Sequence, residues 1–283
     1  WGLFALIRYD VFIFSFGQSL FFRNLDLPLL RLLKKEVIVN LAHGSDARPP
    51  YMNGAIQSKA GEYPEAWKIN LMTQRRKKSV SRNEKWASIV IGAPLSTSHF
   101  CKSKFINSYA LGIPIELIGS GIEMSTSSND EPKKPADLVR ILHCPSNRAV
   151  KGSNEIFAAV ESLKRKGYKI DFVSIHGRPH AEVLRELRKC DFVVDQLFSD
   201  TPMASVSAEA AWFAKPSVVA GYGLDYLVDF IPEDMIPPSK ICHPDSIAKA
   251  IEDLVMNAQE RELLGRKAQL FVLEKWNAEA VAQ

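Results

Sequence analysis

The chain has 283 residues, 46% of them hydrophobic and 24% charged, and carries a formal net charge of +4. This ordinary globular composition excludes collagen, coiled-coil and wholly disordered chains, and the length favours two domains or one large one. The longest apolar stretch, residues 1–22, is interrupted by charged and polar side chains, whereas a membrane-spanning helix needs about 20 consecutive apolar residues.

Short apolar runs alternate with amphipathic segments in the first half of the chain. The pattern predicts strands over residues 10–16 and 36–41, with a helix over 26–35 between them. Two more strands are predicted over 87–91 and 115–118. Runs of about five β-branched residues separated by helices are typical of parallel strands, so we expect a parallel sheet covered on both faces.

A polar segment, residues 125–135, separates two charge regimes. It is rich in Ser, Pro and charged residues and has no apolar side chain. The chain before it has an excess of Lys and Arg, and the chain after it has an excess of Asp and Glu. We therefore predict a linker here, with one domain over residues 1–130 and another over 131–283.

The same alternation is clearer after the linker. The predicted strands cover residues 138–142, 170–175, 191–197 and 217–220, and the predicted helices begin at Ser153 and cover 181–188 and 207–213. The apolar stripe of the first helix comprises Ile156, Phe157, Val160 and Leu163. Two such α/β units in tandem predict two Rossmann-like domains that face a cleft, with ligands at the carboxyl ends of the strands.

Two cations follow the first predicted strand of the second half. Arg148 and Lys151 lie in a polar stretch between this strand and the helix that begins at Ser153. Cations and free backbone N–H groups at a helix N-terminus are well placed to neutralise a diphosphate. Taken alone, such a pair is more often part of an ordinary solvated loop.

Glu209 is expected in the first turn of the helix over residues 207–213, after the strand over 191–197. A carboxylate there is stabilised by the helix dipole and can accept two hydrogen bonds from a ribose diol. The alternative is a charge that only stabilises the helix terminus. Because Glu209 and the two cations lie at strand ends of one predicted sheet, a single nucleotide would reach both.

The segment 140–219 resembles the C-terminal, donor-binding domain of GT-B glycosyltransferases, in particular the large retaining family known as group 1 or family 4. The matching pieces are Arg148, Lys151-Gly152 and the sequences AAVESL, SIHG, CDFVVDQL and EAAWFAKPSVV. Residues 247–276 also resemble the closing helices of this family, so the likeness covers the whole second half.

The first half resembles the family less specifically. EVIVNLAHGSDAR is similar to the family's strand and following His-Gly loop, which implies that His43 lies against the donor sugar. A core or capping histidine is the alternative. Asp46 and Arg48 in the same loop are either structural partners or acceptor contacts. The resemblance also implies that this first domain lacks the family's opening strand and glycine-rich loop.

Some positions depart from the family's pattern. Its E-x7-E pair would place the first glutamate at Thr201, which is not a carboxylate, and the neighbouring Asp200 is a candidate substitute. Ala214 stands where glycine is common before Lys-Pro. These changes leave the nucleotide site in place and weaken the expected donor-sugar contacts, so a retained fold with altered catalysis is an open alternative.

The resemblance implies a hexosyltransferase that moves a sugar from a nucleoside diphosphate donor to a glycan or lipid-linked acceptor during cell-surface polysaccharide synthesis. The expected location is cytoplasmic, on the inner membrane face, and no cofactor is expected. The alternatives are a nucleotide-sugar epimerase and a non-catalytic binding module. The expected catalytic residues are His43, Arg148 and Lys151, and the expected substrate contacts are Glu209, Asp200, Thr201, Asp46 and Arg48.

Metal sites and disulfides are not predicted. The four cysteines show no C-x-x-C pair and are expected to be reduced, and the six histidines show no zinc spacing. The chain also has no D-x-D triplet, which fits a metal-independent diphosphate site.

The densest cationic run is residues 73–86, TQRRKKSVSRNEKW. Such a run is commonly a solvated helix face, and the functional alternative is contact with anionic lipid headgroups or a lipid-linked acceptor. Nucleic acid is not expected as a partner, because the excess is local and no aromatic-interleaved RNA motif accompanies it.

Overall fold

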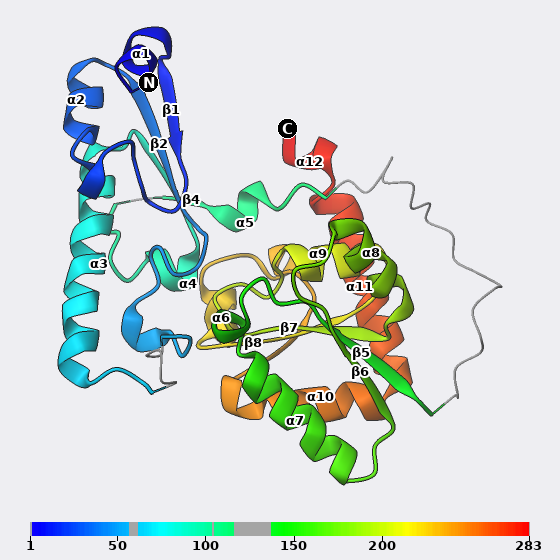
Figure 1. Cartoon of the computed structure of the whole chain (residues 1–283). Helices are drawn as coiled ribbons and strands as arrows, with labels where there is room; N and C mark the ends of the chain where they lie inside the picture. The colour runs from blue at the N-terminus through cyan, green and yellow to red at the C-terminus, as the bar shows by residue number, and fades with distance from the viewer. Residues whose placement is uncertain (1, 57–61, 104, 116–136, 283) are drawn as a thin grey trace. The chain divides into compact units, whose positions relative to one another are not determined.

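A computed structural model of the chain describes residues 2–56, 62–103, 105–115 and 137–282. They divide into two compact units, residues 1–111 with 226–231 and residues 112–225 with 232–283. Each unit contains its own parallel sheet (Figure 1). The predicted linker 125–135, and with it the predicted domain boundary, lies outside the described residues.

The first unit contains four parallel strands in the order β1-β2-β3-β4. Their bounds are β1 Val11–Phe14, β2 Glu36–Leu41, β3 Ile89–Gly92 and β4 Ile106–Asn107. The helices are α1 Gly2–Arg8, α2 Leu27–Leu32, α3 Ala66–Trp86, α4 Pro94–Thr97 and α5 Ser108–Leu111, with 3-10 turns η1 Phe22–Asn24 and η2 Pro50–Met52. The first three predicted strands are confirmed. Of the fourth, 115–118, only Ile115 is described, as an isolated bridge partner of Asn277.

The core of the first unit lies between the sheet and helices α2 and α3. Leu27 and Leu30 of α2, Val37 of β2 and Val80 of α3 are completely buried. Burial alternates along β1, where Phe12 and Phe14 are buried while the intervening side chains are exposed. The prediction that both faces of this sheet are covered is therefore wrong for β1.

The second unit contains five parallel strands in the order β6-β5-β7-β8-β9. Their bounds are β5 Val139–His143, β6 Ile170–Ser174, β7 Phe192–Ser199, β8 Ser217–Gly221 and β9 Lys240–Cys242. The first four confirm the predicted strands, and β9 was not predicted. Every residue of β8 is buried, as expected for a central strand covered on both faces.

Helices cover both faces of the second sheet (Figure 1). Helices α7 and α10 pack together on one face, and α8 and α9, with α11 against α9, lie on the other. The bounds are α6 Arg148–Lys151, α7 Ser153–Arg165, α8 His180–Lys189, α9 Ser205–Trp212, α10 Ile247–Met256, α11 Ala258–Lys275 and α12 Ala278–Ala282. Ile156, Val160 and Leu163 are buried as predicted, whereas Phe157 of the same predicted stripe is 54% exposed. Among the described helices, none combines the length and the apolar character that crossing a membrane requires.

The beginning of the second unit is held by its C-terminal end. Ile115 pairs in parallel with Asn277, and the Ile115 backbone N–H donates to the Trp276 carbonyl at 2.8 Å. Gly112 lies against the Trp276 indole, where a Cβ would come within 2.6 Å of Cδ1. The left-handed backbone of Gly112, with φ +70°, therefore serves both the turn and this close approach.

The four cysteines are free thiols, and burial raises the pKa of each of them. The pKa reaches about 12 for Cys144 and Cys190 and about 11 for Cys242. Because the thiolate is the reactive species, we expect almost no iodoacetamide labelling of the native protein at about pH 8 and full labelling in denaturant. Mass spectrometry counts the labelled thiols. Rapid labelling of native Cys144 would contradict the environment described here.

Candidate functional site

Arg148 and Lys151 lie on α6, a single helical turn between β5 and α7. The Asn147 side chain caps this turn by accepting a hydrogen bond from the Val150 backbone N–H at 3.2 Å. Gly152 follows with φ +70° and separates α6 from α7. The stretch predicted as a loop is therefore helical, because an asparagine N-cap and a left-handed glycine bound it.

Gly152 also holds α6 close to the sheet. A Cβ at this position would lie 2.4 Å from the Leu197 Cβ of β7, so only glycine permits this approach. The two cations consequently project from the carboxyl end of β5 next to β7, its neighbour in the sheet. This is the edge at which ligands bind in parallel α/β sheets.

The Lys151 ammonium is engaged by β7. Its Nζ donates to Asp195 Oδ1 at 3.1 Å and to Gln196 Oε1 at 2.9 Å. The other Asp195 oxygen, Oδ2, accepts from the Ser207 hydroxyl of α9 at 2.8 Å. The Asp195 side chain is only 1% exposed, so its charged carboxylate needs these hydrogen-bonding partners in place of water. A polar chain thus links α6, β7 and α9 at one edge of the sheet.

Arg148 differs from Lys151 in its surroundings. Its side chain is exposed, and no carboxylate within the described ranges forms an ion pair with it. The site therefore contains one cation held by protein groups and one that faces solvent. An anion would reach Arg148 without displacing a protein carboxylate.

Glu209 is the fifth residue of α9, which begins at Ser205. The prediction that it lies in the first turn is wrong, because the helix begins two residues earlier than its sequence pattern suggested. Its Oε1 lies 2.8 Å from His180 Nε2, at the start of α8. The Glu209 side chain is 15% exposed, so its carboxylate is available from the surface and shared with His180.

His143 was not predicted as a site residue. It ends β5 and is 1% exposed, with Nδ1 2.7 Å from the Val194 carbonyl oxygen and Nε2 2.8 Å from Ser153 Oγ. These contacts join two strands to the beginning of α7, directly after the two cations. The signal in the sequence was a polar side chain at the end of a strand, directly after the apolar Ile141 and Leu142.

Burial lowers the pKa of His143, so the folded state favours the neutral imidazole. The unfolded chain, with a pKa of about 6.5, then binds more protons than the folded chain at mildly acidic pH. We expect the free energy of unfolding to fall as the pH decreases from about 7 to about 5. The slope should be smaller in His143→Gln, which urea titrations at each pH would measure. An unchanged slope would contradict this contribution.

The predicted residues of the first unit lie in the loop after β2. His43 is exposed, and its ring stacks on Phe16 with 4.3 Å between the centroids. Asp46 is buried and accepts hydrogen bonds from the backbone N–H groups of His43 and Ala47. Arg48 donates its backbone N–H to Gly44. Asp46 thus holds the backbone of this loop through hydrogen bonds within the loop. The contact of His43 with a donor sugar stays a prediction.

Asp200 and Thr201 follow the end of β7. Asp200 is 7% exposed. The Thr201 hydroxyl donates to the Met203 carbonyl at 3.0 Å and accepts from the Met203 backbone N–H at 3.3 Å. The Thr201 side chain therefore closes a local turn, an ordinary structural use of threonine. Substrate contacts by either residue stay predictions.

Ala214 occupies the position where the sequence pattern favours glycine, and its backbone has φ 53°. This left-handed conformation costs a residue with a Cβ about 1 kcal/mol. Replacing Ala214 with glycine is therefore expected to stabilise the protein by about 0.5 to 1 kcal/mol, which urea denaturation would measure. Ala210→Gly in the interior of α9 is the matched control, and it should destabilise by a similar amount. A loss of stability in Ala214→Gly would contradict the strain.

No cluster of His, Cys, Asp or Glu able to hold a metal ion occurs within the described ranges.

No family model matches the sequence, and no curated protein matches it either. Solved structures do match over almost the whole chain. Sucrose-phosphate synthase from Thermosynechococcus elongatus aligns with 99% of this chain and 73% of its own, with a TM-score of 0.61 and 16% identity.

Two further solved structures align over 99% of the chain. HepE from Anabaena, in complex with UDP-glucose, matches over 78% of its own length with a TM-score of 0.57 and 13% identity. The MnaA-UDP structure from S. aureus matches over 74% of its length with a TM-score of 0.53 and 11% identity. The chain has the GT-B fold. The predicted fold class is thereby confirmed, and the described part of the second unit is built on a parallel five-stranded sheet.

Proposed function

We propose that this GT-B chain is a glycosyltransferase that uses a nucleoside diphosphate sugar as donor. The observation that carries the proposal is the linked polar edge of the second sheet. Lys151 on α6 contacts Asp195 on β7, Asp195 contacts Ser207 on α9, and Glu209 lies two residues further along α9. The complexes of HepE with UDP-glucose and of MnaA with UDP support uridine diphosphate as the carrier.

Each group has a proposed role in sugar transfer. Arg148 and Lys151 stabilise the charge that develops on the diphosphate as its bond to the sugar breaks. Recruitment of Lys151 requires its ammonium to exchange part of its contact with Asp195 for a phosphate oxygen. Glu209 accepts hydrogen bonds from the ribose hydroxyls in place of His180. His43 contacts the donor sugar, and Arg48 contributes to the acceptor side.

The finer features of the proposal concern setting and acceptor. We propose hexosyl transfer without a metal ion to a glycan or lipid-linked acceptor, on the cytoplasmic side of a membrane, during synthesis of surface polysaccharide. The basic segment 73–86 forms the C-terminal two thirds of α3. We propose that it contacts anionic lipid headgroups, since exposed cations near such a surface contribute about 1 kcal/mol each.

The role of Glu209 predicts a loss of nucleotide affinity on substitution. Glu209→Ala removes the two proposed ribose hydrogen bonds, so we expect UDP to bind about tenfold more weakly in isothermal titration calorimetry. Glu155→Ala, which removes an exposed carboxylate from α7 of the same unit, should leave the affinity unchanged. Equal affinities for the two variants would contradict the ribose contact.

Product analysis tests the reaction itself. The protein is incubated with UDP-glucose and a panel of glycan and lipid-linked acceptors, and the products are separated by mass spectrometry. A new glycosidic bond with release of UDP supports the transferase, whereas an isomerised donor indicates the epimerase. A non-catalytic binding module is favoured by Thr201 and by the paired state of Lys151. Donor binding without acceptor-dependent release of UDP would establish that alternative.

A further inference from the structure

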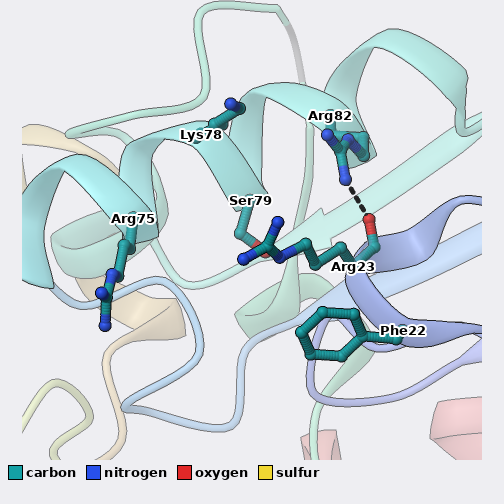
Figure 2. A pocket seen from close by; sticks show the side chains of 6 residues that line it. All are labelled: Phe22, Arg23, Arg75, Lys78, Ser79 and Arg82. Atoms are coloured by element: carbon teal, nitrogen blue, oxygen red, sulfur yellow. Dashed lines mark hydrogen bonds between the residues drawn. The ribbon is translucent and has the colours of Figure 1, made fainter.

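A pocket of about 500 Å³ lies in the first unit, between η1 and α3 (Figure 2). Four of the six residues that line it are cations and none is acidic. The lining residues are Phe22, Arg23, Arg75, Lys78, Ser79 and Arg82. A pocket with several positive charges and one hydroxyl group matches the chemistry of a phosphate group.

Helix geometry places three of the cations on one side of α3. Arg75, Lys78 and Arg82 are spaced three and four residues apart, so they lie along the same helix face. No described carboxylate forms an ion pair with any of them. No ion pair among the described residues offsets their mutual repulsion, and a bound anion would reduce it.

The other wall of the pocket is a loop held in an uncommon backbone conformation. Arg23 and Asn24 both have φ 57°. The Arg82 guanidinium donates a hydrogen bond to the Arg23 carbonyl oxygen, and Figure 2 shows the Arg23 side chain extending along α3 toward Ser79. The buried Asn24 side chain donates to Asn83 Oδ1 at 2.6 Å and to the Gly17 carbonyl at 2.8 Å.

A buried carboxylate holds the same loop from its other end. Asp26, 2% exposed, accepts hydrogen bonds from the Ser19 hydroxyl and from the backbone N–H groups of Leu20 and Phe21. The loop therefore presents Arg23 to the pocket without further ordering. A site built in advance in this way loses less conformational entropy when an anion binds.

Exposed apolar side chains border the cations on this loop. Phe21 is 54% exposed, Phe22 78% and Leu25 64%. Exposed apolar side chains gain no favourable contact from a soluble phosphate. A bilayer surface, in contrast, has phosphate groups at the depth of the headgroups and apolar acyl chains directly below them.

We propose that this pocket binds the phosphate group of an anionic membrane lipid. Arg23, Arg75, Lys78 and Arg82 would contact the phosphate while Phe22 enters the interface between headgroups and acyl chains. The inference rests on the proposed membrane contact of residues 73–86 and makes it specific. One built site, rather than diffuse charge along α3, would recognise the headgroup.

Cosedimentation with vesicles tests the proposal. The full chain is mixed with phosphatidylcholine vesicles with or without phosphatidylglycerol, and we expect binding only when the anionic lipid is present. Lys78→Glu should weaken that binding at least about tenfold. The matched control is Lys77→Glu, which reverses the adjacent exposed charge outside the pocket and should weaken binding clearly less than Lys78→Glu does. Phe22→Ser should weaken binding without changing the net charge.

The outcomes distinguish a lipid phosphate from a soluble one, and the specific pocket from the general membrane contact of residues 73–86. Equal losses in Lys78→Glu and Lys77→Glu would overturn the pocket in favour of diffuse attraction, and no binding to anionic vesicles would overturn the membrane contact as well. Pyrophosphate that binds without vesicles and depends on Lys78 but not on Phe22 would assign the pocket to a soluble phosphate instead. All three variants should bind UDP normally, so these results are independent of the second unit.

Discussion

Replacing Lys151 with methionine is expected to reduce sugar transfer at least about a hundredfold, because it removes a positive charge that would stabilise the departing diphosphate. Methionine keeps much of the length and apolar stem of lysine, so the change removes mainly the charge. The release of UDP in the presence of acceptor measures the effect. Near-normal turnover would contradict the role of Lys151.

The same substitution also tests the ion pair with Asp195. A buried carboxylate that loses its partner is costly, so Lys151→Met should lower the free energy of unfolding by about 2 to 3 kcal/mol. Adding Asp195→Asn removes the unpaired charge and should recover a large part of this loss, as urea denaturation would show. The double variant should remain inactive. Recovered activity would mean that Lys151 has only a structural role.

Replacing Gly265 with alanine is expected to destabilise the protein by about 2 to 3 kcal/mol. Gly265 lies in α11, where a new Cβ would be 2.1 Å from the Ala214 carbonyl oxygen and 2.9 Å from its carbon. In an exposed helix the same change would stabilise by about 1 kcal/mol, so a loss would be due to the close approach. Thermal and urea denaturation both measure the difference.

The control for Gly265→Ala is Lys267→Ala, an exposed position on the same helix. It should change stability by less than about 0.5 kcal/mol. If Gly265→Ala were as stable as this control, α11 would not approach the turn at Ala214 as closely as described. The turn itself would then have room for a larger neighbour.

Strands β5, β7 and β8 of the second unit were predictable because they are central and largely buried. SVVAG of β8 is mostly apolar and buried throughout, and FVVDQLFS of β7 is buried at every position except Gln196, as a parallel strand covered on both faces requires. Strand β9 was missed because Lys240–Cys242 has only three residues, none of them buried. The exposure of Phe157 was missed because hydrophobic periodicity shows which side of a helix is apolar, but not how much of that side the neighbouring elements bury.

The candidate site was predictable in composition and not in its contacts. Arg148, Lys151 and Glu209 were proposed from their positions at strand ends and from the resemblance to a family. The pairing of Lys151 with Asp195 depends on two segments brought together by the sheet order, and sequence spacing does not encode that distance. A hint was present, because an aspartate within an apolar strand requires a partner when it is buried.

The pairing of Ile115 with Asn277 places the start of the second unit beside the end of its last long helix. A domain whose two ends are neighbours tolerates circular permutation, because a short connection can join the old ends while new termini open elsewhere. A version of the second unit with residues 112 and 282 joined is therefore expected to keep its parallel sheet, and the edge that carries Lys151 and Asp195, in a chain with a different order of elements.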